Sequence, residues 1–187
     1  MEFMPSGSIR TLLNKFGSFQ EKLVKKYTKQ ILEGLEYLHS NGIIHRDIKG
    51  ANILVDRDGS VKLTDFGAAK HLGSALINDS YLMSKSLRGS PYWMAPEIAK
   101  RTGHTFSADI WSVGCVIIEM MTGIPPWSEK SRDVKRVLEL IRTTEVPPEF
   151  PANASATCLS FLKSCWVINP EERKSLKELF QHPFIAD

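Results

Sequence analysis

The most informative segment of the sequence is His45-Arg46-Asp47-Ile48-Lys49-Gly50-Ala51-Asn52. Two further motifs follow it along the chain, first Asp65-Phe66-Gly67 and then Ala95-Pro96-Glu97. Each has an ordinary structural explanation, because an isolated His-x-Asp is usually part of a turn and Asp-Phe-Gly alone can be a strand-to-turn junction. All three in this order leave little room for coincidence, so we interpret them as parts of one functional signature.

In this order the three motifs resemble the signature of a protein kinase catalytic domain. Phosphoryl transfer needs an acceptor hydroxyl held in line and metal ions that neutralise the phosphate charge. The resemblance implies that Asp47 accepts the hydroxyl proton and that Lys49 supplies a positive charge for the transferred phosphate. Asn52 and Asp65 offer hard oxygen ligands of the kind that Mg²⁺ takes. The implied cofactors are therefore ATP and Mg²⁺.

Composition and net charge indicate which kinds of binding partner to expect. The chain has 187 residues, of which 42% are hydrophobic and 24% charged, as is usual for a soluble domain with a sizeable core. Its formal net charge of +3 is too small to indicate binding to nucleic acid or to an anionic membrane. We therefore expect neither of these partners.

The cysteines and the hydropathy of the chain indicate the cellular compartment in which the protein is expected. The cysteines, Cys115, Cys158 and Cys165, are odd in number and lack C-x-x-C spacing, so they indicate neither a disulfide framework nor a zinc site. The most apolar stretch, residues 113–121, is interrupted by Glu119 and is too short to span a bilayer. No charged region followed by an apolar run opens the chain. These observations predict a cytoplasmic protein without membrane insertion.

The first nine residues, Met1-Glu2-Phe3-Met4-Pro5-Ser6-Gly7-Ser8-Ile9, resemble the hinge of the mitogen-activated protein kinase kinase kinase family. In that family two glycines usually precede the serine that corresponds to Ser8, and in this chain Ser6 replaces the first of them. The resemblance implies that main-chain groups of Glu2 and Met4 pair with the adenine edge and that Ser8 lies near the ribose. The alternative interpretation of this segment is a flexible N-terminus.

A capping pattern and an apolar stripe predict the helix that leads to the signature loop. In Ser18-Phe19-Gln20-Glu21 the serine hydroxyl and the glutamate carboxylate can satisfy orphan amides at a helix start. Asn41-Gly42 supplies a left-handed stop. The resemblance assigns the base to Asp47, which leaves His45 a structural hydrogen-bonding role. The apolar face recurs at steps of three and four residues, at Val24, Tyr27, Ile31, Leu35 and Leu38.

A short hairpin is predicted directly after the loop. Residues 52–55 and 60–64 have the pattern of two strands, and Asp56-Arg57-Asp58-Gly59 between them favours a tight turn. Such a hairpin brings the two candidate metal ligands to the same edge. The resemblance implies that Leu54 forms the floor of the adenine pocket and that Thr64 lines it, although both residues would equally suit a plain core.

The region between Asp65 and Glu97 is interpreted as an activation segment. Residues 73–90 in its middle are polar and serine-rich, as expected of a loop that another group must order. Ser86 stands where the family commonly carries its activating phosphosite, and Arg46 and Lys70 resemble the basic pair that receives the phosphate. The alternative is that the serines are only solvated loop residues. The candidate phosphoacceptors are Ser80, Ser84 and Ser86.

Ser90 occupies a position at which most of the family has threonine. The resemblance implies that its hydroxyl bonds Asp47 and Lys49 and so helps to position the substrate, a role that serine preserves. Serine/threonine kinases carry a lysine at the position of Lys49, which indicates specificity for aliphatic hydroxyl groups.

The second half of the chain is expected to be helical. Residues 108–123 are apolar almost all round, as in a helix buried at the centre of a domain. Asp109 matches the family's aspartate that braces the backbone of the catalytic loop, and the resemblance implies that Arg173 pairs with Glu97. Further helices are expected at residues 134–141, 158–167 and 175–180.

We therefore expect an α+β, protein-kinase-like fold, with a hinge segment at residues 1–8 and a mainly helical C-terminal lobe at residues 9–187. The Gly-rich loop, the strand lysine and its glutamate partner have no counterpart in the chain, so we expect an incomplete kinase domain without the N-terminal β lobe. The resemblance implies a serine/threonine kinase that acts as a MAP kinase kinase kinase on a MAP kinase kinase. The alternative is a truncated kinase-like binding module. The intact polar residues of the signature favour catalysis, because a pure binding module has no chemical need for all of them.

We predict that these 187 residues alone do not transfer phosphate. The triphosphate of ATP would lie open to water, where charge interactions are several-fold weaker than in a closed site. Calorimetric titration with Mg²⁺-ATP and an assay with a generic basic protein substrate would measure this. Micromolar ATP affinity together with measurable turnover would contradict the prediction.

Overall fold

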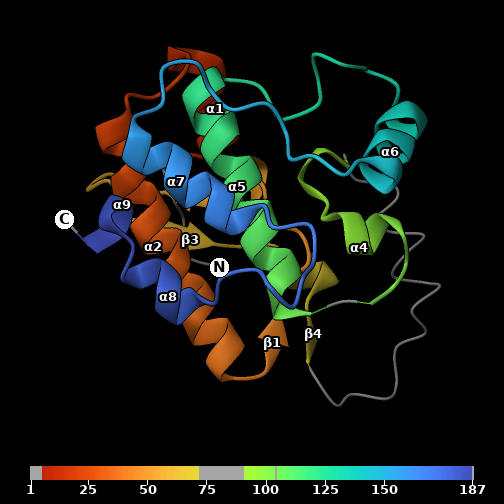
Figure 1. The fold of residues 1–187 in the computed structure, drawn as a ribbon. Helices are drawn as coiled ribbons and strands as arrows, with labels where there is room; N and C mark the ends of the chain where they lie inside the picture. The colour runs from red at the N-terminus through yellow and green to blue at the C-terminus, as the bar shows by residue number, and fades with distance from the viewer. Residues whose placement is uncertain (1–5, 72–90, 104, 187) are drawn as a thin grey trace.

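The structure, a computed structural model, describes residues 6–71, 91–103 and 105–186. It has the mainly helical α+β architecture that the sequence predicts (Figure 1). The helices are α1 (Ile9–Phe16), α2 (Glu21–Ser40), α4 (Pro96–Ala99), α5 (Phe106–Thr122), α6 (Val134–Thr143), α7 (Ala156–Cys165), α8 (Leu176–Phe180) and α9 (Pro183–Ala186). The 3₁₀ turns are η1 (Gly50–Asn52), η2 (Phe66–Ala68) and η3 (Pro91–Trp93). The strands are β1 (Ile43–Ile44), β2 (Ile53–Val55), β3 (Val61–Leu63) and β4 (Lys70–His71).

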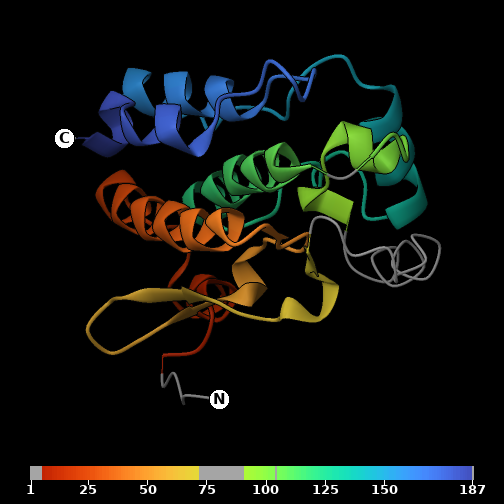
Figure 2. The same ribbon diagram turned by 90° about the horizontal axis from the view of Figure 1, so that it is seen from below.

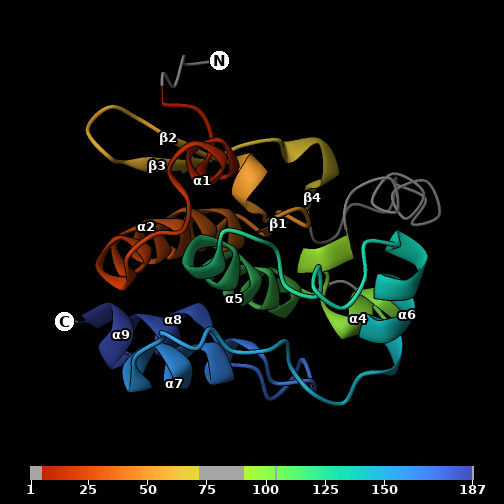
Figure 3. The same ribbon diagram turned by 90° about the horizontal axis from the view of Figure 1, so that it is seen from above.

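Three layers stack around helix α5. Figures 2 and 3 show α7, α8 and α9 on one side, α2 and α5 in the middle, and α1 with the β2–β3 hairpin on the other side. Contacts join α5 to both α2 and α7, so its surface is covered from more than one direction. This placement explains why the sequence of α5 is apolar almost all round.

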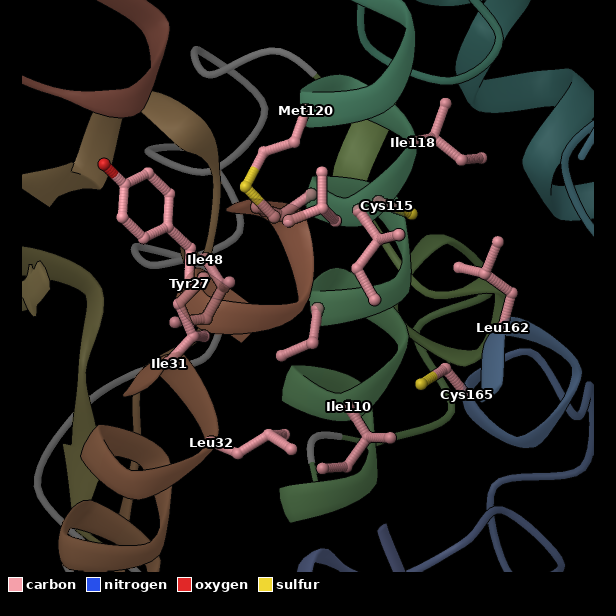
Figure 4. Packing of buried hydrophobic residues seen from close by; sticks show 14 of the residues in the cluster. Tyr27, Ile31, Leu32, Ile48, Ile110, Cys115, Ile118, Met120, Leu162 and Cys165 are labelled. Atoms are coloured by element: carbon pink, nitrogen blue, oxygen red, sulfur yellow. The ribbon is translucent and has the colours of Figure 1, made fainter. Parts of the chain in front are cut away.

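Helix α5 confirms the prediction made for residues 108–123. It begins two residues earlier, at Phe106, and ends at Thr122, where Gly123 takes the left-handed conformation with φ 82°. Trp111 and Ile117 in its middle are fully buried. Burying each such apolar side chain contributes roughly 1.5–3 kcal/mol. Figure 4 shows this packing, with Ile110, Cys115, Ile118 and Met120 of α5 between Tyr27, Ile31 and Leu32 of α2 and Leu162 and Cys165 of α7.

The capping box predicted at Ser18 is wrong. Helix α2 begins only at Glu21, and Gln20 is its N-cap without a side-chain hydrogen bond. The Glu21 carboxylate instead accepts from the backbone N–H of Ser155 at 2.8 Å and from its hydroxyl at 2.5 Å. Glu21 therefore ties the start of α2 to the start of α7. The predicted end of α2 is confirmed, since Gly42 has φ 72°.

The three remaining helix predictions are confirmed with small shifts of their ends. Helix α6 extends two residues beyond the predicted range 134–141, to Thr143. Helix α7 lies two residues upstream of the predicted range 158–167 and is capped by Ser155, whose hydroxyl accepts from the N–H of Cys158. The third, predicted at 175–180, is α8, which has a complete capping box between Ser175 and Glu178.

Two antiparallel strand pairs flank residues 45–52, which we call the loop 45–52. Strand β1 pairs with β4, and β2 pairs with β3 in a hairpin whose turn contains Gly59 at φ 75°. Each hairpin strand is shorter than the predicted ranges 52–55 and 60–64. The Thr64 N–H donates to the Asn52 carbonyl at 3.0 Å, so the residues at the open end of the hairpin lie side by side.

The three cysteines are buried free thiols. Burial raises the pKa of Cys158 to about 12, so its thiol stays neutral and serves as packing.

No helix within the described residues combines the length and the apolar character needed to cross a lipid bilayer.

Candidate functional site

Asp109 of helix α5 holds the start of the loop 45–52. Its carboxylate is almost fully buried and accepts the backbone N–H groups of His45 and Arg46, each at 2.9 Å and each on a different oxygen. His39 Nε2 lies 2.9 Å from Oδ2 of the same carboxylate. Arg46 has φ 71°, a left-handed conformation that costs a non-glycine residue about 1–2 kcal/mol. The two accepted hydrogen bonds help to offset this cost, and the contact expected between Asp109 and the loop backbone is present.

The imidazole of His45 fixes the next part of the loop. The ring is fully buried, and its burial lowers the pKa of His45 while the nearby Asp109 opposes the shift, so the ring is neutral at neutral pH. Its Nε2 lies 3.1 Å from the carbonyl oxygen of Thr64, which requires a proton on Nε2. Nδ1 is then free to accept the N–H of Asp47 at 3.3 Å. His45 therefore acts through hydrogen bonds to the backbone, as the sequence indicated.

Asp47 receives two donors on one carboxylate oxygen. Lys49 Nζ lies 2.7 Å from Oδ2, and Asn52 Nδ2 lies 2.8 Å from the same atom. Asn52 also donates to the backbone carbonyl of Asp47 at 2.9 Å. The Asp47 side chain is about one-third exposed, which leaves it accessible from one side. Three residues predicted for catalysis are thus brought together in one hydrogen-bonded group.

The oxygens of Asn52 and Asp65 fit the demands of Mg²⁺. Because the amide nitrogen of Asn52 donates to Asp47, its amide oxygen is left for another partner. Asp65 follows the hairpin with φ 61°, and its carboxylate is exposed apart from a weak 3.4 Å contact with the N–H of Gly67. The described residues contain no group of three or more His, Cys, Asp or Glu side chains that is arranged to hold a metal ion. One amide and one carboxylate still suit Mg²⁺, which keeps several waters and takes few protein ligands.

The start of the described chain lies against the hairpin. Ser8 forms an isolated antiparallel bridge with Leu54, and the N–H of Val55 donates to the Gly7 carbonyl at 2.8 Å. The Ser8 hydroxyl caps helix α1 by accepting from the N–H of Thr11 at 3.2 Å. Leu54 and Thr64 are both half-buried, and the structure brings Ser8 and Leu54 together. The predicted adenine contacts of Glu2 and Met4 lie outside the described residues.

The predicted regulatory and substrate-positioning residues lie only in part within the described residues. Ser86 and Ser90 lie outside the described residues. Lys70 pairs through its backbone with Ile44, between strands β4 and β1, and Arg46 is half-buried in the loop 45–52.

Glu97 is anchored to the helical core as the sequence predicted. Arg173 donates to its two oxygens at 2.7 and 3.1 Å, and both side chains are buried. The guanidinium group also donates to the carbonyl of Ser107 and lies 5.2 Å from the ring of Trp111. Removing one partner of such a buried pair typically costs about 3–5 kcal/mol, so the Ala95-Pro96-Glu97 motif is firmly attached.

Sequence reasoning missed the part that Glu119 plays. This carboxylate lies on α5, is fully buried, and accepts hydrogen bonds from Arg10, Gly50 and Trp93. A signal for it was available, because a lone carboxylate in an otherwise apolar helix is seldom buried without donors.

Comparisons with known proteins agree with this geometry. The family described as "Protein kinase domain" matches residues 1–185. The chain is 55% identical to "Mitogen-activated protein kinase kinase kinase 3" of Arabidopsis thaliana over all of its 187 residues, which are 28% of that relative. It is 50% identical to "Mitogen-activated protein kinase kinase kinase A" of Dictyostelium discoideum, again over the whole chain and over 19% of the relative. The chain therefore spans less than a third of these relatives, and the predicted resemblance is confirmed.

We predict that Asp109→Asn weakens the folded state by about 1–3 kcal/mol, the usual cost of a buried polar group that loses its partner. Asparagine has one oxygen, so its amide nitrogen would face a backbone N–H that needs an acceptor. Urea denaturation followed by tryptophan fluorescence would measure the free energy of unfolding. Asp133→Asn is the matched control, because Asp133 caps α6 at an exposed site where asparagine caps equally well. Equal stability of the two variants would contradict the prediction.

Proposed function

Because the chain belongs to the protein kinase family, we propose that the protein at its natural length transfers the γ-phosphoryl group of ATP to a serine or threonine hydroxyl of a protein. The observation that carries the proposal is the shared acceptor of Lys49 and Asn52, which both donate to Oδ2 of Asp47. With Oδ2 occupied in this way, Oδ1 is the oxygen left for a substrate hydroxyl. A carboxylate held on one side and open on the other suits the orientation of an attacking oxygen.

In this proposal the residues around Asp47 have separate tasks. Asp47 accepts the proton of the substrate hydroxyl on Oδ1, and His45 and Asn52 hold Asp47 in place. Lys49 supplies a positive charge next to the transferred group. The amide oxygen of Asn52 and the carboxylate of Asp65 would hold Mg²⁺. When bound, Mg²⁺-ATP supplies the phosphoryl group and the metal charge that neutralises it.

We assign the nucleotide side of the site to the segment that meets the hairpin. Leu54 and Thr64 would contact the adenine, and Ser8, which pairs with Leu54, would lie near the ribose. The main chain of Glu2 and Met4 would pair with the adenine edge. The bridge between Ser8 and Leu54 supports this assignment, because it places two of the residues side by side.

The activation segment supplies the proposed control of the reaction. Phosphorylated Ser86 would bind Arg46 and Lys70 through charge-assisted hydrogen bonds, and Ser90 would position the substrate through Asp47 and Lys49. Arg46 is adjacent to Asp47 in the loop 45–52, so a phosphate bound to it would act directly on the loop.

The proposed substrate is a MAP kinase kinase, and the proposed location is the cytoplasm. Support for the substrate comes from the relatives, which are named mitogen-activated protein kinase kinase kinases.

We predict that Asp47→Asn, made in the protein at its natural length, lowers kcat by about 10²–10⁴-fold, the usual contribution of a positioned base. The affinity for ATP should change little, because adenine contacts lie elsewhere. Steady-state kinetics with a protein substrate and calorimetry with Mg²⁺-ATP would measure both quantities. Asp58→Asn, on the exposed hairpin turn, is the control and should leave both unchanged. A variant that kept more than about a tenth of the wild-type kcat would refute the role of Asp47.

We predict that Ser86→Ala slows substrate phosphorylation by about tenfold or more, because the charge-assisted bonds of a phosphoserine are lost. Ser74→Ala is the matched control, because Ser74 lies in the same segment and is not a candidate phosphoacceptor, and it should have little effect. Arg46→Ala should make activity insensitive to the state of Ser86, as measured by kinase assay after phosphatase treatment. Mass spectrometry of the active enzyme that finds Ser86 unmodified would count against the prediction.

A further inference from the structure

Helix α2 has an outer face on which charges of opposite sign occupy opposite halves. The helix packs on α5 and on strand β3, and the residues on its remaining side are exposed (Figure 3). Because an α-helix has 3.6 residues per turn, positions three, four and seven apart lie on one stripe. We call the charged residues of this stripe, which are exposed except for the half-buried Lys25, the α2 stripe. Its members are Lys22, Lys25, Lys26, Lys29, Glu33 and Glu36.

The charges of the α2 stripe are arranged against the stability of the helix itself. A helix favours negative groups near its N-terminus and positive groups near its C-terminus, whereas the stripe has lysines first and glutamates last. The four lysines include two pairs at a spacing of four residues, where like charges repel. Glu21 does begin the helix, but both of its carboxylate oxygens bind Ser155. The order of the charges therefore has no explanation in the helix alone.

The α2 stripe forms no ion pair within the part of the chain that the structure describes. Lys29 and Glu33 stand four residues apart in the less favourable order, with the lysine first. Lys26 extends toward the hairpin turn, where hydrogen bonds from Ser60 and, to a smaller extent, the charge of Lys26 lower the pKa of Asp58. Apart from this long-range effect, the charged groups of the stripe are open to another molecule.

The presence of both signs decides which kind of partner fits. A phospholipid surface or a nucleic acid is negative throughout, so it would be attracted by the lysines and repelled by Glu33 and Glu36. A fitting partner presents negative groups to the first half of α2 and positive groups to the second half. Helix α2 of a second copy does this when the two helices run antiparallel, because the same stripe then meets itself in reverse.

The spacing of the charges sets the register of such a pair. A two-fold axis level with Ile31 lies two residues from both Lys29 and Glu33, and five residues from both Lys26 and Glu36. In the antiparallel pair, Lys29 is therefore opposite Glu33 of the second copy, and Lys26 is opposite Glu36 of the second copy. The axis repeats each contact, so these two pairings give four contacts between opposite charges.

We propose that the α2 stripe is a self-association surface, through which two copies of the protein pair with their α2 helices antiparallel. Exposed ion pairs stabilise a contact only weakly and are screened by salt. The association is therefore weak, reversible and sensitive to ionic strength. It does not depend on the proposed phosphoryl transfer, because no residue of the loop 45–52 takes part in it.

Charge reversal tests the pairing in the protein at its natural length. Lys26→Glu with Lys29→Glu makes the stripe negative throughout positions 26–36, and Glu33→Lys with Glu36→Lys makes it positive throughout. Each double variant then repels a copy of itself, so its dissociation constant should rise about tenfold or more. An equal mixture of the two variants restores all the contacts between opposite charges, and it should associate within about threefold of the wild type.

Sedimentation velocity at about 1–100 µM protein would measure the association, because a micromolar dissociation constant is visible in this range. Raising the salt concentration from about 0.05 to 0.5 M should weaken the wild-type pair about tenfold. Lys135→Glu with Arg136→Glu, at exposed positions of α6, is the control with the same change of net charge and should leave the association unchanged. All variants should melt at nearly the same temperature, because substitutions at exposed positions perturb the fold little.

A second measurement tests the register without any substitution. A carbodiimide joins an amine directly to a carboxylate that it touches. In an equal mixture of isotopically light and heavy protein, mass spectrometry should find Lys29 of one copy joined to Glu33 of the other. Cross-links of Lys29 found only within one copy would contradict the register.

The remaining outcomes are distinct. A wild-type protein that stays monomeric over this concentration range at low salt would overturn the proposal, and so would double variants that associate as the wild type does. A mixture of the two variants that stays dissociated would overturn it as well, because antiparallel pairing requires the rescue. If the monomeric wild type bound phosphatidylserine vesicles and Lys26→Glu with Lys29→Glu abolished that binding, the stripe would be a membrane-binding surface and the proposal would fail.

Discussion

A carboxylate buried in an apolar helix needs donors around it, and this requirement shapes the centre of the molecule. Helix α5 carries two such groups, Asp109 near its start and Glu119 near its end, and both accept backbone N–H groups of the loop 45–52. The residues of this loop take part in neither of the two strand pairs. Its conformation is therefore set by a helix that lies far away in the sequence.

The arrangement also explains how a strained loop can be kept rigid. Arg46 adopts a left-handed backbone conformation, and Gly50 makes a contact too close for any side chain. Each departure from ordinary geometry coincides with a hydrogen bond to α5. Between these two anchors, the neutral His45 ring and the Asn52 amide hold Asp47 through its backbone and side chain. Rigid support of this kind is what a site needs if its reacting groups are to stay within a fraction of an ångström of their working positions.

Much of the fold was predictable, because its elements are defined by local patterns. The apolar stripe of α2, the apolar α5 and the Asp-Gly turn of the hairpin each carry their signal within a few residues. From the family resemblance we also predicted that Asp109 braces the backbone of the loop 45–52 and that Arg173 pairs with Glu97. The failures involve distant partners. The capping box at Ser18 does not form because Glu21 binds Ser155, 134 residues away. The contacts of Glu119 come from α1, from the loop and from the activation segment, and no local pattern relates Arg10, Gly50 and Trp93.

The loop 45–52 and its acceptors on α5 are far apart in the sequence, and this has a consequence for synthesis of the protein. His45 and Asp109 are 64 residues apart, and a ribosome that adds about 5–20 residues per second needs roughly 3–13 s to cover that distance. During that time the nascent chain already contains α2, whose apolar face is uncovered, and a loop whose amides have no acceptor. This exposure ends only when α5 has left the ribosome and packs against α2. A chaperone that binds exposed apolar helix faces would find its target here.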